Sequence, residues 1–170
     1  MAQRSQNFWD FSVDLYARDR VANACLDLQT TCQVDVNVLL LCYWHGMYHG
    51  ELSDEILSQA LDISAHWNRQ VVQPLRHVRK WMKEHPEGLP MGDRVEFETL
   101  RGRVKLDELA AEKIEQELLE QLCLMRLDTR PANVGFSACE KNVALLLNRM
   151  GIQPNDLIAA RLRLIGNALK

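Results

Sequence analysis

Four polar residues lie beside strongly apolar segments, and the carboxylates among them have the chemistry for acid–base work. Asp10 and Asp14 lie in an aromatic segment, and Asp35 and Asn37 precede the apolar run 38–44. A carboxylate among apolar side chains acquires a raised pKa, which suits a general acid or base. We favour the alternative that Asp35 and Asn37 cap a helix and that Asp10 hydrogen-bonds a neighbouring helix end. The residues of this candidate pocket are Trp9, Asp10, Asp35, Asn37 and Trp44.

His45 and His49 have the spacing of a possible metal site. Residues four apart share one face of a helix, and Glu51 follows directly. Two imidazoles and a carboxylate are ligands of zinc and iron. The neighbouring glycines, however, indicate that the helix ends here. A histidine near the C-terminal end of a helix interacts favourably with the helix dipole, so no metal is needed to explain these residues. We therefore predict no metal and no cofactor, and His45 and His49 are only weak metal candidates.

The segment from His66 to Lys83 is basic and carries two tryptophans. Its five Arg and Lys residues are accompanied by no acid. Cations interleaved with aromatic rings suit phosphate contact and base stacking, so the segment is a candidate site for an anion, a nucleic acid or another partner. The candidate contacts are Trp67, Arg69, Arg76, Arg79, Lys80 and Lys83.

An acidic stretch from Asp107 to Glu120 offers those cations a partner within the chain. It holds six carboxylates, and Lys113 is its only base. If the two segments pack as antiparallel helices, their charges set the register, although exposed pairs contribute only about 0–1 kcal/mol each. We favour this internal pairing over an anion site. The formal net charge of −3 also gives no global reason to expect nucleic acid.

Apolar side chains recur at helical spacing along nearly the whole chain. Helices are expected over residues 7–18, 20–33, 35–50, 53–61, 67–84, 94–127, 137–150 and 154–170. The first two should form a short hairpin, and the last two a C-terminal helical hairpin over 137–170. Pro74 must either kink its helix or mark a new start near Asn68.

Several residues have the character of helix ends or linkers. Ser53 and Asn155 are expected N-caps, and Ser137 with Glu140 has the pattern of a capping box. The segment His85–Asp93 holds two prolines and two glycines and is expected to be a linker.

The composition sets the class of the protein. A chain of 170 residues with 47% hydrophobic content builds a core as one domain, and 8 Gly and 5 Pro are few for a protein of many strands. The five cysteines form no C-x-x-C pair, and neither a leader peptide nor a membrane span is evident. We expect an all-α, single-domain bundle of about seven or eight helices over residues 1–170, in the cytoplasm.

Several segments together resemble an uncharacterised proteobacterial family. They are Phe8–Ala17, Asp35–Trp44 and the stretch from Trp67 through Pro74 to Arg79, which match the pattern FWDFSxxLYA, DVNxLLxxxW and W…VVxPLRxxR. The core of the resemblance covers residues 8–127. This family has no established activity, cofactor or partner, so the resemblance supports the helical interpretation and implies no reaction.

The sequence leaves three functional hypotheses. The preferred one is a cytoplasmic protein-binding or adaptor module without catalysis, whose anchors would be any exposed tryptophan among Trp9, Trp67 and Trp81. No P-loop, dinucleotide-binding or hydrolase motif points to an enzyme. The alternatives are an enzyme or metal protein with an Asp/Asn/His-lined pocket, and an anion or nucleic-acid site on the basic segment. The expected partner is a protein of unknown identity, and association with a second copy of the chain is an open alternative. No membrane association is expected.

Overall fold

The computed structural model describes residues 6–84, 94–126 and 133–170, and within these it contains only helices and their connections. The predicted all-α class is confirmed. The elements are α1 Phe8–Tyr16, α2 Val21–Cys32, α3 Val36–Tyr48, α4 Asp54–Trp67, the π-helical turn η1 Asn68–Val72, α5 Gln73–Glu84, α6 Arg94–Leu124, α7 Phe136–Arg149 and α8 Asp156–Asn167. The predicted linker His85–Asp93 lies outside the described residues.

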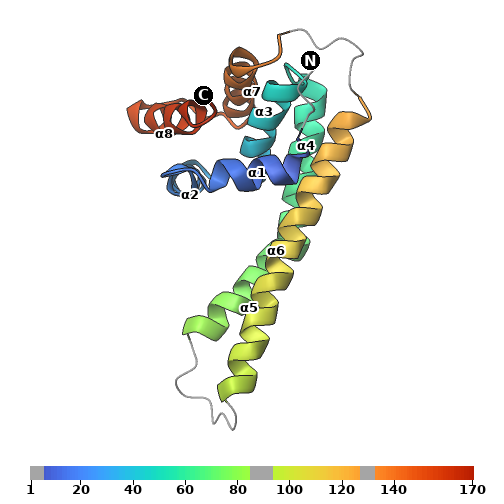
Figure 1. Ribbon diagram of the computed structural model, residues 1–170, viewed down its shortest axis with the longest axis vertical. Coiled ribbons are helices and arrows are strands. Elements are labelled where there is room, and N and C mark those ends of the chain that lie inside the picture. Colours follow the sequence, from blue (N-terminus) through green and yellow to red (C-terminus); the bar gives the residue numbers. More distant parts are fainter. Residues whose placement is uncertain (1–5, 85–93, 127–132) are drawn as a thin grey trace.

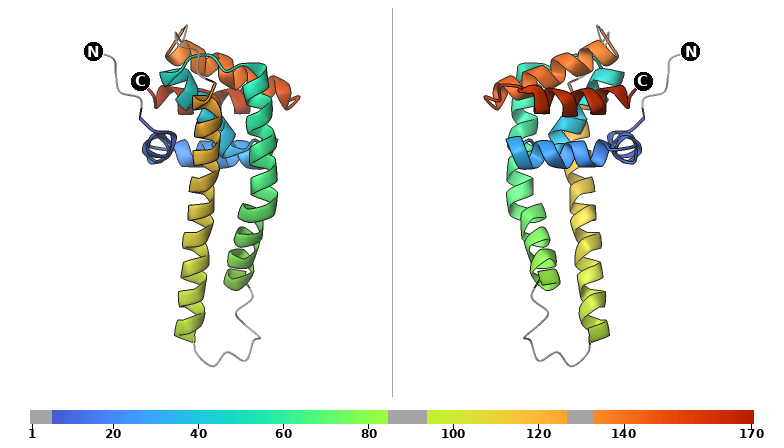
Figure 2. Two further views of the ribbon diagram at one scale, coloured as in Figure 1. Left: turned by 90° about the vertical axis from the view of Figure 1, so that its right-hand side faces the viewer. Right: turned by 90° about the vertical axis from the view of Figure 1, so that its left-hand side faces the viewer.

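The molecule consists of a head and an arm (Figure 1). In the head, α1, α2, α3, α7 and α8 gather around the adjoining ends of α4 and α6. The arm, which we define as α5 and residues 94–109 of α6, projects from the head as two helices lying side by side (Figure 2). One long helix therefore contributes to both parts.

Pro74 lies inside a continuous helical rod rather than at a break. A proline has no N–H to donate, and its ring clashes with the carbonyl four residues earlier. The wider turn η1 precedes it, and Gln73 N–H bonds to the carbonyl of Asn68, five residues back. The rod α4–η1–α5 thus accommodates the proline by one π turn, which resolves the two alternatives left open by the sequence.

Helix α3 is the centre of the head, as its apolar sequence predicts. Every residue from Val38 to Gly46 is buried, and α7 packs along it. Asp35 caps its start by accepting from the N–H groups of Asn37 and Val38 at 2.8 and 3.1 Å. Asn37, by contrast, does not cap through its side chain, so only half of that expectation holds.

Three other local predictions can be compared with the structure. Ser53 and Asn155 are N-caps as expected. The capping box is wrong, because α7 already begins at Phe136 and Gly135 occupies the cap position without a side-chain bond. Gly135 reaches this position with a φ of +120° and donates its N–H to the carbonyl of Gly46 at 2.7 Å, so contact with α3 sets the start of α7.

The helix pairs also differ from simple hairpins. In Figure 1 α1 lies in the plane of the view and α2 is seen end-on, and Figure 2 shows the reverse. These two helices form a corner, so the predicted short hairpin is wrong. At the C-terminal end, α7 packs mainly on α3 and α8 mainly on α2. Packing partners rather than chain order decide both arrangements.

Two chemical expectations concern the whole fold. All five cysteines are free thiols, and four of them are buried. Within the described residues, no helix combines the length and the apolar composition that crossing a bilayer requires.

Gly46 tests the packing of α3 on α7. A Cβ at this position would lie 2.5 Å from the backbone nitrogen of Cys139, far inside contact distance. We expect Gly46→Ala to lower the free energy of unfolding in urea by about 1–3 kcal/mol or more, because backbone must move. Gly102→Ala is the control, since nothing lies within 4 Å there. It should instead stabilise α6 by about 0.5–1 kcal/mol; equal effects of the two changes would contradict the close contact.

Candidate functional site

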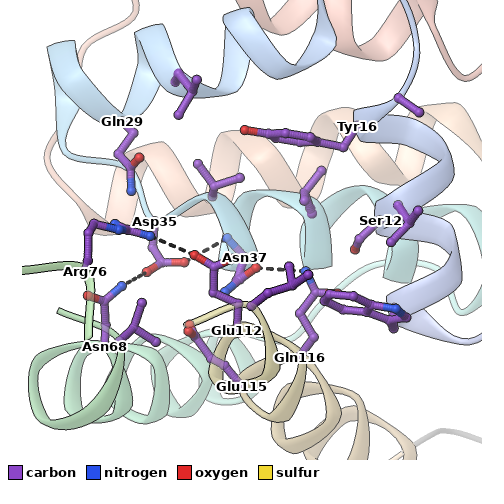
Figure 3. A pocket seen from close by; sticks show the side chains of 18 residues that line it. Ser12, Tyr16, Gln29, Asp35, Asn37, Asn68, Arg76, Glu112, Glu115 and Gln116 are labelled. Carbon is purple, nitrogen blue, oxygen red and sulfur yellow. Dashed lines mark hydrogen bonds and ion pairs between the residues drawn. The ribbon is translucent and has the colours of Figure 1, made fainter. Parts of the chain in front are cut away.

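A pocket of about 430 Å³ lies at the base of the arm. Its walls come from α1, α2, α3, η1, α5 and α6, so it forms where the arm meets the head. The apolar part of the wall includes Trp9, Val13, Tyr16, Leu40, Val72 and Leu109. Figure 3 shows a group of polar side chains from α3, η1, α5 and α6 across the pocket from Tyr16.

Asp35 and Asn37 line this pocket at the start of α3. Besides capping α3, Asp35 accepts from Asn68 Nδ2 at 3.3 Å, which connects α3 to the π turn. Asn37 Oδ1 accepts from Gln116 Nε2 at 2.8 Å (Figure 3). That bond fixes the Gln116 amide, and the amide oxygen Oε1 is buried with no hydrogen-bond partner in the part of the chain that the structure describes.

Glu115 is the most deeply buried acid of the pocket wall. Its side chain is fully buried, Oε1 accepts from Ser64 Oγ at 2.7 Å, and Oε2 has no hydrogen-bond partner within the described ranges. Burial raises the pKa of this carboxyl to about 7, and the nearby Asp35 carboxylate adds to the shift, whereas the side chains of Ser64 and Asn37 lower the pKa as hydrogen-bond donors. Glu115 therefore changes protonation close to neutral pH.

Ser12 contributes a third polar atom without a partner. It lies on α1, is only 3% exposed, and its Oγ makes no hydrogen bond to the described residues. Ser12, Glu115 and Gln116 all line the same pocket. A buried polar group without a partner costs about 1–3 kcal/mol, and such groups call for an explanation by water, an ion or a ligand.

Arg76 and Arg79 pair with the acidic helix, as the sequence analysis favoured. Arg76 bonds Glu108 at 2.9 Å and Glu112 at 2.7 Å, and Arg79 also bonds Glu108. Burial alone would raise the pKa of Glu108, but the two guanidinium groups hold it below its usual value. These contacts fix the register of α5 on α6. Arg76 also lines the pocket (Figure 3).

The remaining residues of the basic segment are spread over the arm. Arg69 lines a second hollow of about 590 Å³ that adjoins the first and shares Asp35 and Asn68 with it. Lys80 lies 3.8 Å from Glu84, and Lys83 is exposed. Of the tryptophans, Trp67 donates its indole N–H to the Ala111 carbonyl at 2.9 Å, while Trp81 is 43% exposed.

Two members of the candidate pocket are not part of it. Asp10 is exposed and bonds Asn7, its own helix cap. Trp44 is buried in the head, where its indole N–H donates to the Gln6 carbonyl at 2.8 Å. Only Trp9, Asp35 and Asn37 of the five line the pocket.

The histidines and Glu51 do not come together as a ligand set. His45 is buried and bonds the Gly50 carbonyl at 2.9 Å, and burial lowers its pKa to about 4. His49 packs its ring against Trp44, whereas the Glu51 carboxylate pairs with Lys141 at 2.5 Å. Within the described residues no group of three potential ligands is close enough to hold a metal.

A family comparison covers this part of the chain. The family described as "Protein of unknown function (DUF2390)" matches residues 7–119. The chain belongs to this family. All residues that line the pocket fall inside the matched segment, so the DUF2390 region contains the complete pocket. No curated protein and no solved structure matches the chain.

Ser12, Glu115 and Gln116 line the DUF2390 pocket but are not among the residues expected there from the sequence. A signal for Glu115 was present, because it lies four residues from both Ala111 and Leu119 and therefore in the apolar row of α6. Its grouping with five other acids hid this. Ser12 and Gln116 carry no comparable pattern, since their burial depends on how α1 and α6 pack.

The pH dependence of stability tests the burial of Glu115. Its folded pKa is raised from 4.5 to about 7, so unfolding releases a proton between these values and stability falls as pH rises. Over pH 4.5 to 8 the wild type should lose about 3 kcal/mol of unfolding free energy that Glu115→Gln does not lose, so the difference between the two proteins should change by that amount in favour of the variant. Urea unfolding across this range measures the difference. The exposed neighbour variant Glu117→Gln should run parallel to the wild type, and a parallel Glu115→Gln curve would contradict the raised pKa.

Proposed function

We propose that this chain is a binding protein that holds a small organic molecule in the pocket at the base of the arm. The observation that carries the proposal is that three residues lining one cavity, Ser12, Glu115 and Gln116, each have a buried polar atom without a hydrogen-bond partner among the described residues. The cytoplasmic location and bacterial origin expected from the sequence stay predictions.

The size and lining of the pocket support this function. Ligand sites are typically clefts of about 300–1,000 Å³ with apolar walls and a few placed polar groups, and they occur between the helices of bundles. The cavity of about 430 Å³ has this character. It also borders η1, and π turns inside helices are frequent at functional sites.

The polar atoms also distinguish this pocket from a packing gap. An apolar cavity leaves no hydrogen bond unmade, whereas Glu115 and Gln116 lose hydrogen bonds to water when the chain folds. A ligand that bonds to them regains this energy only in the folded protein, and so stabilises it.

Fluorescence titration with 1-aminoanthracene, a flat uncharged probe that brightens in apolar surroundings, tests whether the pocket takes a small molecule. Leu109 lines the pocket and is 50% exposed. We expect Leu109→Trp to block the opening and to weaken binding at least tenfold. Leu106→Trp is the matched control, because Leu106 is on the same helix, 65% exposed, and outside the lining. Absence of binding, or equal binding by both variants, would refute the proposal.

A second candidate function is the protein-binding module favoured by the sequence. The observation in its favour is a row of three exposed apolar side chains on one side of α6, Leu100, Ile114 and Leu118, which are 50%, 44% and 38% exposed, with the exposed Asp107 between the first two. At 100° per residue these three share one side of the helix, and Leu109 and Gln116 at the pocket lie on another. We expect an amphipathic helix of a partner protein to lie along this row and complete a three-helix bundle.

Photo-crosslinking tests this second candidate. A benzoylphenylalanine in place of Leu100 should give one discrete adduct with a partner chain in cells. The same residue in place of the exposed Lys105, which lies on the opposite side of α6, should give none. Identical products at both positions, or none at Leu100, would exclude the row as a docking surface.

A further inference from the structure

The polar atoms left without partners indicate which ligand the pocket takes. We infer that the ligand is an organic amine, with its cationic head between Glu115 and Gln116 and a flat apolar body against Trp9 and Tyr16. This inference rests on the proposed function and specifies its ligand class.

The three atoms of the lining residues that have no hydrogen-bond partner in the described residues are mainly acceptors, so they favour a ligand that donates. Gln116 Nε2 is used by Asn37, so the free Oε1 is an acceptor only. Glu115 Oε1 already accepts from Ser64, and the free Oε2 is an acceptor when the carboxyl is ionised. Ser12 Oγ accepts or donates. The ligand must therefore bring donors, and an ammonium group supplies three.

The charged groups of the pocket wall also favour a cationic ligand. The pocket wall holds three carboxyl groups, of Asp35, Glu112 and Glu115, and one cation, Arg76. Arg76 is already bonded to Glu112 and Glu108, while Asp35 is bonded to backbone N–H groups and Asn68. Glu115 is the carboxyl of this wall with an oxygen, Oε2, that has no hydrogen-bond partner among the described residues. An ammonium group beside it would complete a charge-assisted pair out of water.

The apolar wall of the pocket favours a ligand with a flat ring. Trp9 and Tyr16 are two turns apart on α1, so their rings lie on the same side of the helix, and both line the pocket. Aromatic faces accept flat rings and also attract cations. Val13, Leu40 and Val72 complete an apolar surface around them. The pocket thus combines an apolar part for a ring with an acidic end.

Protonation follows from the same geometry. The groups that face Glu115 are Ser64 on α4, Asp35 and Asn37 at the start of α3, and Glu112 and Gln116 on its own helix, with Arg76 on α5. The pKa of Glu115 is raised to about 7, whereas an alkylamine stays protonated through this range. Binding should therefore strengthen as Glu115 ionises, by up to about tenfold from pH 6 to pH 8.

Isothermal titration calorimetry with three compounds of one shape tests the ligand class. Tryptamine carries the amine, tryptophol an uncharged hydroxyl and indole-3-propanoate a carboxylate. At pH 8 we expect tryptamine to bind at least tenfold more tightly than either of the others. Its affinity should fall toward pH 6, with proton release measurable in buffers of different ionisation enthalpy.

Variants assign the effect to the pocket. Glu115→Gln should weaken tryptamine at least tenfold at pH 8 and abolish the pH dependence, and Gln116→Leu should weaken it at constant pH dependence. Glu117→Gln removes the same charge from an exposed position of α6, outside the lining, and should change nothing. Unfolding curves of each variant separate lost binding from lost structure.

The possible outcomes separate the two proposals. If tryptophol or indole-3-propanoate binds as tightly as tryptamine, the amine class is wrong and the small-molecule function stands. Tryptamine binding that is equal in Glu115→Gln and wild type likewise overturns the assignment of the cationic head. If none of the three compounds nor 1-aminoanthracene binds, the pocket holds only water and both proposals fall.

Discussion

The pairing of α6 with the rod α4–η1–α5 is the constraint on which the rest of the structure depends. Successive contacts tie the two helices together, from Ser64 with Glu115 and Trp67 with Ala111 to the arginines with Glu108. Polar bonds at defined positions within an apolar seam admit one register, since a shift by one residue would leave charges buried without partners. This register brings Glu115 and Gln116 to the end of α3, where the pocket forms.

The π turn is the local feature that adapts the rod to this pairing. A π turn holds more residues than an α turn, so it rotates the side chains of α5 relative to those of α4. Asn68 and Val72 within the turn, and Arg76 beyond it, all face the pocket. Pro74 cannot donate to the carbonyl of an α-helical partner, which makes the wider turn acceptable at this point. The backbone irregularity and the pocket therefore have a common origin.

Elements with strong local signals could be predicted from the sequence, and contacts between distant segments could not. The Asp35, Ser53 and Asn155 caps were recognisable because a cap depends on neighbouring residues. The start of α7 after its cap residue Gly135 was not recognisable, because it depends on a hydrogen bond to Gly46, almost ninety residues away. For the same reason Asp35 and Asn37 could be named as pocket residues, whereas Ser12 could not, and Asp10 and Trp44 lie outside the lining of this pocket.

The energetics of the pocket wall argue that its polar groups serve more than folding. Ser12 Oγ, Glu115 Oε2 and Gln116 Oε1 are each desolvated at a cost of about 1–3 kcal/mol, and no hydrogen bond to the described residues offsets it. The register of α6 does not need the charge of Glu115, because Ser64 would donate equally to an uncharged amide oxygen and Glu108 already binds both arginines. A charge that weakens the folded state and that the register does not require is best understood through what it binds, as expected where function and stability compete.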